Sequence, residues 1–245
     1  MTASIRDLSY DLRTISPNDQ MLDEGEASRA EYFKVGREAL AVCKRALAGI
    51  TPKRILDFPV GHGRVVRWFR NEWPDAEIFG VEIDEDALAF SSKQFRLTPQ
   101  RSDVKLERTV LPGGLDLIFS GSLLTHFDEY QWDNYLRICA DALAIGGILV
   151  FTTHGRVAAM QMDDRHPMYR NLIDTRPLYE EYLRTGFAYA PYSPEYPTYG
   201  LSLSSPSWIM SKVEKIPDLK IIGFQEQGWG QDVVMLRKNE WPMVR

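Results

Sequence analysis

Arg54-Ile-Leu-Asp-Phe-Pro-Val-Gly-His-Gly-Arg-Val-Val66 is the stretch around which the chain is organised. Its apolar pair Ile55 and Leu56 is typical of a buried strand, and its last residues can begin the apolar face of a helix. Between them, Gly61 and Gly63 remove side chains where the backbone must turn and can approach a ligand closely. The stretch therefore predicts a strand that passes through a glycine turn of the nucleotide-binding type into a helix.

Strands and helices alternate on both sides of this turn. Further strands are expected at 76–82, 115–119 and 148–153, with a less regular one between 97 and 108, and helices at 26–48, 64–73, 84–95 and 128–144. This alternation indicates parallel βαβ units and the α/β class. A last helix at 206–215 and strands at 219–224 and 232–236, joined through Gly228-Trp-Gly230, predict a terminal antiparallel hairpin.

Composition and charge narrow the class of protein. The net charge of -5 over 245 residues gives no global reason to expect nucleic acid as a partner. Residues 1–14 lack the apolar core of a signal peptide, and no apolar run approaches membrane-spanning length. Cys43 and Cys139 lie in helix-like segments, so buried thiols are expected instead of a disulfide. We expect a soluble, cytoplasmic protein with no membrane or nucleic-acid partner.

Two acids follow two of the expected strands. Asp57 ends the first strand, and Glu82 ends the second about 20 residues after the glycine turn. An acid at that distance can reach ribose hydroxyls. Each signal alone is more typical of a structural turn or a helix cap, so only their combination predicts a nucleoside-type ligand.

Together with the fourth and fifth strands and the terminal hairpin, these features resemble the class I S-adenosylmethionine-dependent methyltransferases over roughly residues 54–236. Asp57-Phe-Pro-Val-Gly-His-Gly63 is similar to the family's first motif, Asp-x-Gly-x-Gly-x-Gly, and Glu82 to its ribose-binding acid. Three further segments resemble family motifs: Asp103 the acid near the adenine amino group, 116–126 the fourth-strand motif, and 143–150 the Leu-x-Pro-Gly-Gly segment before strand five.

The resemblance implies S-adenosylmethionine as cofactor and a Rossmann-like methyltransferase sheet, mostly parallel with a C-terminal antiparallel hairpin and helices on both faces. It also implies a set of cofactor contacts in the loops after the strands: Asp57, Pro59, Gly61, Gly63, Arg64, Glu82, Ile83, Asp103, Ser120, Gly121 and Ser122.

Pro59 departs from the family pattern, which usually has glycine at this position. Proline has no amide hydrogen and a fixed φ, so the loop must be shaped differently there. The departure leaves open an alternative in which the chain is a non-catalytic, cofactor-binding partner subunit.

A single methyltransferase domain is expected over residues 1–245. Its expected parts are an N-terminal arm and helix (1–50), a cofactor-binding core (54–154), an irregular acceptor-side insertion (155–204), and the last helix and hairpin (205–245). The arm contains turn formers at 16–19 and is expected to become ordered by docking. The helix after it is expected to pack on the sheet edge, with a lid over the cofactor as the alternative.

Phrases at 121–126, 151–156 and 199–208 resemble a bacterial subset of these enzymes often found beside glycosyltransferases. That resemblance implies a saccharide or a related small-molecule acceptor. Methyl transfer to a hydroxyl by in-line displacement is expected, and N-methylation of an amine metabolite is the alternative. The oligomeric state stays undetermined.

A hydroxyl acceptor needs a general base, and a histidine with a pKa near neutrality suits this task. His154 follows the fifth strand and His126 the fourth, at the strand ends where open α/β sheets bind ligands. We expect His154 to be the base and His126 to be the second candidate, with loop anchoring as the alternative for each. His62 is expected to shape the cofactor turn and His166 to lie in a solvated loop, and four scattered histidines predict no metal site.

Three residues of the insertion are expected near the acceptor. Tyr192 and Tyr199 can stack on a sugar or an aromatic ring, or can simply pack the insertion onto the domain. Arg156 can clamp an anionic acceptor or form a surface salt bridge.

Overall fold

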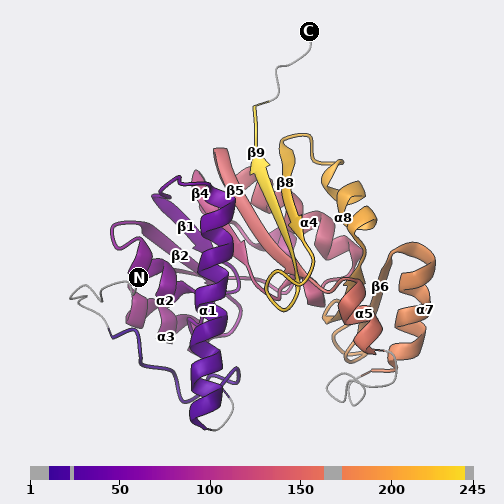
Figure 1. Ribbon diagram of the computed structural model, residues 1–245, viewed down its shortest axis with the longest axis horizontal. Helices are drawn as coiled ribbons and strands as arrows, with labels where there is room; N and C mark the ends of the chain where they lie inside the picture. The colour runs from indigo at the N-terminus through magenta and orange to yellow at the C-terminus, as the bar shows by residue number, and fades with distance from the viewer. Residues whose placement is uncertain (1–10, 23–24, 163–172, 241–245) are drawn as a thin grey trace.

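The structure, a computed structural model, describes residues 11–22, 25–162 and 173–240. Seven strands form one sheet in the order β3-β2-β1-β4-β5-β9-β8 (Figure 1). Strands β1 to β5 are parallel, and β9 is antiparallel to both of its neighbours, β5 and β8. The predicted mostly parallel sheet with a C-terminal antiparallel hairpin is confirmed.

The strands of this sheet are β1 (Arg54–Asp57), β2 (Glu77–Glu82), β3 (Thr98–Arg101), β4 (Leu115–Ser120), β5 (Leu143–Thr153), β8 (Leu219–Gln225) and β9 (Asp232–Lys238). The helices packed on it are α1 (Glu26–Leu47), α2 (Val66–Glu72), α3 (Glu85–Phe95), α4 (Glu129–Ala142) and α8 (Pro206–Val213).

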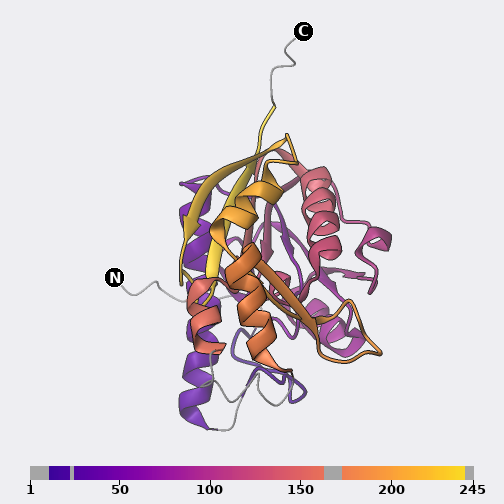
Figure 2. The ribbon, with the colours of Figure 1, turned by 90° about the vertical axis from the view of Figure 1, so that its right-hand side faces the viewer.

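The central strands are buried on both faces. Successive side chains of a strand point to opposite faces, so Ile55 of β1 packs with α1, α2 and α3, whereas its neighbour Leu56 packs with α4 and α8. The same alternation divides Leu117 and Ile118 of β4 between the two cores. Figure 2 shows the sheet between α1 on one face and α4 on the other. Helices on both faces, as predicted, follow from continuous apolar strands.

Two helix caps match the predicted starts. The Asp84 carboxylate accepts hydrogen bonds from the amides of Asp86 and Ala87, and Asp128 accepts one from the amide of Gln131. The Gln131 side chain does not complete a capping box with Asp128, because its amide donates to the Val104 carbonyl at 2.9 Å. Strand β5 begins earlier than expected, at Leu143, because the Gly146-Gly147 pair lies within the strand and not in a loop before it.

Residues 155–204 contain more regular structure than their pattern predicts. Their described parts form α5 (Arg156–Met162), α7 (Thr175–Thr185) and an antiparallel pair, β6 (Phe187–Pro191) and β7 (Gly200–Ser204). These short elements share a small core of their own, which includes Ala159, Leu178 and Leu203. The unit lies beyond the carboxyl end of β5 (Figure 1), and the Ser204 amide donates to the His154 carbonyl at 2.9 Å.

Three sequence expectations concern the rest of the chain. Cys43 and Cys139 are both buried and free. Within the described ranges, every helix is too short or too polar to cross a bilayer. His166 lies outside the described residues.

Gly36 lets α1 cross closely over the start of α2. A Cβ at this position would lie 2.2 Å from the Arg64 carbonyl oxygen and 2.5 Å from Cδ1 of Trp68. We predict that Gly36→Ala lowers the free energy of unfolding by about 1–3 kcal/mol, although alanine is the better helix former by about 1 kcal/mol. Denaturant titration measures this, with the exposed Glu38→Ala of the same helix as the control. Equal stability of the two variants would show that α1 can move away without loss.

Candidate active site

The candidate site lies where three parallel strands end. Asp57 of β1 is in register with Gly80 of β2 and Phe119 of β4, so the residues after these strands meet at one edge of the sheet. A cavity of about 430 Å³ opens there. Ten of the predicted site residues line it: Asp57, Pro59, Gly61, Arg64, Glu82, Ile83, Gly121, Ser122, His126 and Tyr199. Gly63, Asp103, Ser120, His154, Arg156 and Tyr192 do not.

The glycine turn forms one wall. Gly61 and Gly63 have φ values of 51° and 83°, in the region that favours glycine. A Cβ on Gly63 would lie 2.3 Å from the Phe95 ring, whereas nothing lies within 4 Å of the corresponding position on Gly61. Gly63 therefore serves packing, and Gly61 faces open space in the cavity.

Pro59 fits this turn because its neighbours carry the hydrogen bonds. The Phe58 amide donates to the Phe119 carbonyl and the Val60 amide to the Val81 carbonyl, each at 3.0 Å. The missing amide of Pro59 thus falls between two bonded ones, and the preceding peptide bond is cis. Proline in place of the usual glycine therefore leaves the hydrogen bonds on either side of this position intact.

Glu82 holds the turn against β2. One carboxylate oxygen accepts the Gly61 amide at 2.9 Å, and the other accepts the amides of Ile83 at 2.8 Å and Asp84 at 3.1 Å. The side chain is buried and lines the cavity. Glu82 is therefore both a structural acceptor for the turn and an acidic group facing the ligand space.

Asp57 carries an unsatisfied buried oxygen. The residue is 1% exposed, lines the cavity, and its Oδ2 atom has no hydrogen-bond partner among the described residues. Burial, and then the neighbouring charge of Glu82, raises the pKa of Asp57 well above its usual value. A cation bound beside Asp57 would give its Oδ2 atom a partner and would lower its pKa.

Arg64 and Trp229 close the cavity on the side of α1. The guanidinium lies 6.0 Å from the Trp229 ring, whose indole nitrogen donates to the Val35 carbonyl of α1 at 2.8 Å. Burial lowers the pKa of Arg64. The sequence does not place Trp229 at this site, since a tryptophan in a hairpin turn has no motif that reports its contact with a distant strand end.

Asp103 lies in a second, more open hollow of about 410 Å³ with Arg101, Ser102 and Arg108. Ile83 lines both this hollow and the main cavity, so the two adjoin. Ser120, by contrast, is fully buried.

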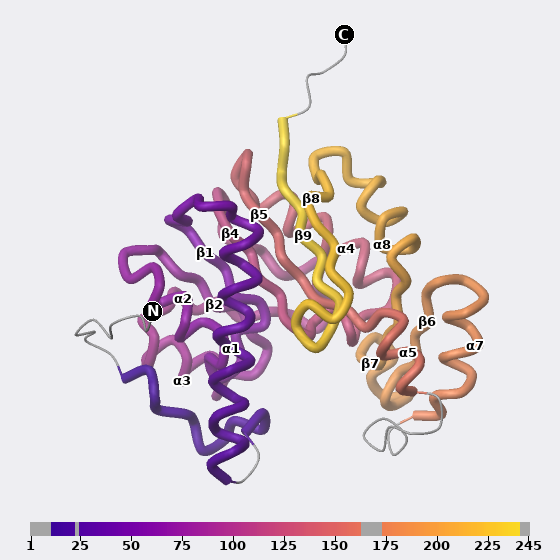
Figure 3. Tube along the Cα trace, viewed as in Figure 1, coloured from indigo at the N-terminus to yellow at the C-terminus, as the bar shows by residue number. Residues whose placement is uncertain are grey.

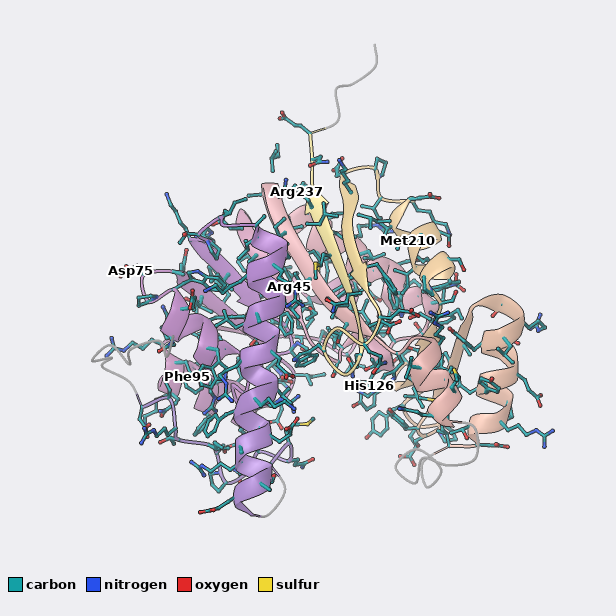
Figure 4. The ribbon with its side chains drawn as sticks, viewed as in Figure 1. Arg45, Asp75, Phe95, His126, Met210 and Arg237 are labelled. Carbon is teal, nitrogen blue, oxygen red and sulfur yellow. The ribbon has the colours of Figure 1, made fainter. Side chains whose placement is uncertain are left out.

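His126 projects into the cavity from the loop after β4. Its Nδ1 atom lies 2.9 Å from the Gly200 carbonyl oxygen and 3.0 Å from the Tyr192 hydroxyl. A carbonyl can only accept, so the ring places its proton on Nδ1 and leaves Nε2 as an acceptor. Burial lowers the pKa of His126. Figure 4 shows the residue between the lower end of the sheet and the unit that contains α5 and α7.

His154 lies deeper in the protein. It is 7% exposed, its ring hydrogen-bonds the backbone of Ser202, and Nε2 lies 3.5 Å from the Gln231 side-chain nitrogen. Burial, with a smaller contribution from His126, lowers its pKa to about 4. The structure therefore brings His126, the second candidate from the sequence, to the cavity wall and keeps His154 behind it.

Of the three predicted acceptor contacts, Arg156 and Tyr192 do not line the cavity, whereas Tyr199 does. Arg156 is exposed and forms an ion pair with Glu226, with Nη2 2.6 Å from Oε2. Tyr192 reaches His126 but does not line the cavity itself, while Tyr199 does both, with its ring centroid 5.0 Å from that of His126.

The N-terminal arm supplies a wall that the motifs did not reveal. Residues 18–21 line the cavity beside the glycine turn, with Asp19 Oδ1 4.0 Å from Nδ1 of His62. Figure 3 shows the arm passing below α3 to the start of α1. Buried Asp19 accepts the Tyr32 hydroxyl at 2.6 Å, and Arg67 donates to the carbonyls of Leu12 and Thr14 at 2.8 and 3.0 Å. The described part of the arm therefore docks onto α1 and α2 and covers the site, a role that the sequence offered only for α1 and only as the alternative to packing on the sheet edge.

Within the described residues, no group of three or more His, Cys, Asp or Glu side chains is arranged to hold a metal ion.

Comparison with known proteins agrees with this geometry. Residues 55–147 match a family described as a methyltransferase domain. A candidate O-methyltransferase from Nostoc punctiforme is 15% identical, with a TM-score of 0.57, and the match covers 91% of this chain and 63% of that one. Human N-acetylserotonin methyltransferase in complex with S-adenosylmethionine is 15% identical, with a TM-score of 0.56 and coverage of 88% and 57%.

The plantazolicin methyltransferase BpumL, in complex with S-adenosylhomocysteine, is 13% identical, with a TM-score of 0.57 and coverage of 86% of each chain. The chain spans less than two thirds of the length of the Nostoc and human proteins. The chain has the class I S-adenosylmethionine-dependent methyltransferase fold.

The human protein was solved with S-adenosylmethionine and BpumL with S-adenosylhomocysteine, and the cavity residues of this chain fit such a ligand. S-adenosylmethionine carries a sulfonium and an ammonium group. The partnerless Asp57 oxygen is a buried acceptor suited to such a cation, and Gly61 leaves room for close backbone approach.

The raised pKa of Asp57 predicts proton-linked donor binding. In the empty site the neutral acid is favoured, whereas a bound ammonium favours the carboxylate, so binding releases a proton. Donor affinity should therefore rise with pH and level off once the pH exceeds the raised empty-site pKa of Asp57. Calorimetry with S-adenosylmethionine in buffers of different ionisation enthalpy measures the released proton. Asp57→Asn should lose both the proton release and the pH dependence; their persistence would assign them to another group.

The arm contacts predict slower ligand exchange in the wild type. Tyr32→Phe removes the hydroxyl that donates to Asp19 and accepts from Arg67 at 3.2 Å. We expect the dissociation rate of S-adenosylhomocysteine to rise by about tenfold, as for loss of one hydrogen bond to a charged group. Stopped-flow displacement measures the rate, with the exposed Tyr130→Phe as control. An unchanged rate would mean that the ligand leaves without opening the arm.

Proposed function

We propose that the chain transfers the methyl group of S-adenosylmethionine to a hydroxyl of a small-molecule acceptor, with His126 as the general base. The observation that carries the proposal is the state of His126. It lines the cavity with Nδ1 committed to the Gly200 carbonyl, which leaves Nε2 available for a proton.

Several groups of the chain are suited to hold the donor. Asp57 and Glu82 provide acidic acceptors at the ends of β1 and β2, and Gly61 permits close approach of the backbone. Ile83 and Asp103 stand where the main cavity adjoins the second hollow, on the side that the family resemblance assigns to adenine. When bound, S-adenosylmethionine supplies a methyl group that is already activated on a sulfonium for in-line displacement.

The task left to the protein is to orient the acceptor and remove its proton. A base must be unprotonated at working pH, and the burial that lowers the pKa of His126 keeps it neutral. The 34° interplanar angle to Tyr199 and the contact with Gly200 hold the ring in one orientation. Exclusion of water by the arm and by the β6–β7 pair favours transfer to the acceptor over side reactions.

Two features support an alcohol over an amine as acceptor. A neutral amine is already nucleophilic and needs no oriented base, whereas an alcohol does. The names of two similar structures also refer to O-methyltransferases, from Nostoc punctiforme and from Burkholderia thailandensis. N-methylation of an amine metabolite remains the second candidate, because the two proteins named for N-acetylserotonin and plantazolicin have this fold and their names do not specify a hydroxyl acceptor.

The test measures kcat and the affinity for S-adenosylhomocysteine separately in a variant of His126. His126→Gln should lower kcat by about 10²- to 10⁴-fold and leave the affinity for S-adenosylhomocysteine within about twofold. The wild-type rate should stay constant as the pH falls through about 6.5, the usual histidine pKa, and decline only below it, because protonation of His126 is displaced to lower pH.

His154→Gln serves as the comparison, since that ring lies behind the cavity wall. A greater loss of kcat with His154→Gln than with His126→Gln would return the base to His154. Full turnover by both variants would favour the amine acceptor.

A further inference from the structure

The charges of the cavity are unequally distributed. Among the described residues, the side chains that line it include four carboxylates, Asp19, Asp57, Glu82 and Asp84, and one guanidinium, Arg64. Three of these acids follow β1 and β2, which places them on the donor side. An anion entering this space would meet net negative charge, and like charges across an interface oppose binding.

The side of the cavity after β4 is uncharged. It is lined there by Ser122, Leu123 and His126, which follow this strand, and by Tyr199, whose ring contacts His126. Arg156 is paired with Glu226, and Arg101 and Arg108 lie in the adjoining hollow. Of the described arginine and lysine side chains, Arg64 alone lines the main cavity, and it lies among Asp19, Asp57 and Trp229.

Several polar groups on this side already form hydrogen bonds within the protein. The Ser122 hydroxyl accepts a hydrogen bond from the Gln231 side-chain nitrogen at 2.9 Å, and the Ser122 amide donates one to the Thr152 hydroxyl at 2.8 Å. Nδ1 of His126 is committed to Gly200. A polyhydroxylated ring needs many hydrogen-bond partners to replace water, and this wall offers few.

Large apolar side chains stand exposed on the rim instead. Met21 of the arm is 63% exposed, Tyr199 is 52% exposed and Ile83 is 45% exposed, and all three line the cavity. The Tyr199 ring is held in place by His126 and by an edge contact with Tyr192 at 5.3 Å. A fixed aromatic face beside a base, with further apolar side chains around it, is a platform for a flat apolar ligand.

We propose that the acceptor is an uncharged hydroxyl compound with a flat apolar face, which stacks on Tyr199 and presents its hydroxyl to His126, and that the site rejects anionic acceptors. This inference rests on the proposed function and narrows its small-molecule acceptor to one class, in place of the saccharide that the sequence resemblance implied. Its basis is the juxtaposition of the exposed Tyr199 ring with an uncharged wall and an acidic donor side.

The experiment uses the full chain saturated with S-adenosylhomocysteine and three probes in calorimetry. They are naphth-2-ol, its anionic analogue 6-hydroxy-2-naphthoate, and methyl α-glucopyranoside. Naphth-2-ol is expected to bind at least about tenfold more tightly than either of the others. Equal or tighter binding of the naphthoate, preference for the glucoside, or no binding of naphth-2-ol would each overturn the proposal.

Variants of Tyr199 test whether naphth-2-ol binds on this ring. Tyr199→Ala should weaken the binding of naphth-2-ol by at least about tenfold. Tyr199→Phe should retain most of the affinity, because phenylalanine keeps the ring face on which the ligand stacks. Tyr196→Ala, an exposed tyrosine of the same unit that does not line the cavity, is the matched control. Unchanged affinity in Tyr199→Ala would overturn the proposal.

The affinity for S-adenosylhomocysteine, measured first in every variant, reports folding and separates two failures. If the wild-type chain does not bind S-adenosylhomocysteine, the proposed function fails. If it binds that ligand but not naphth-2-ol, only the acceptor class fails.

Discussion

The candidate site depends on two buried carboxylates at the ends of adjacent parallel strands. Asp57 and Glu82 come together because β1 and β2 run parallel in register, and the sheet is covered on both faces. Glu82 is satisfied by three backbone amides, which fixes the glycine turn, but one oxygen of Asp57 has no partner among the described residues. Burying charge without a partner is unfavourable, so the site is built to favour a cation. Both the raised pKa of Asp57 and the suitability of the cavity for S-adenosylmethionine follow from this constraint.

A second buried charge links the turn to the arm. The Arg67 guanidinium donates to the Gly63 carbonyl at 2.8 Å, to two carbonyls of the arm, and to the Tyr32 hydroxyl of α1. One planar group with five donors can satisfy all these acceptors at once. The turn, α1 and the arm are thereby held in one arrangement. The Arg67 side chain therefore positions both the arm and the glycine turn, which line the same cavity. The further cover comes from the unit after β5, which brings Tyr199 and the Gly200 carbonyl to His126.

Much of the fold could be read from local patterns because they report local physics. Apolar runs marked β1, β4 and β5, and Asp84 and Asp128 marked helix starts through their capping hydrogen bonds. The unit at 155–204 was taken as irregular because its short helices bury only a few residues each, in a small core assembled from distant positions such as Ala159 and Leu203. The predicted cofactor contacts divide as well: Asp57, Gly61 and Glu82 meet at one cavity, whereas Gly63 packs against Phe95 and Ser120 is buried.

The sequence alone determined the class of sheet, the position of the glycine turn and the acids beside it, since strand periodicity, glycine freedom and strand-end placement are properties of short segments. Only the tertiary structure decided which histidine faces the ligand. His126 and His154 occupy equivalent strand-end positions in the sequence, but the β6–β7 pair turns the first toward the cavity through Gly200 and buries the second against Ser202. The arm and Trp229 likewise reach the site through contacts with Tyr32 and Val35 that are distant in the chain or carry no motif. Orientation and burial depend on long-range packing, and a single sequence records no such contacts directly.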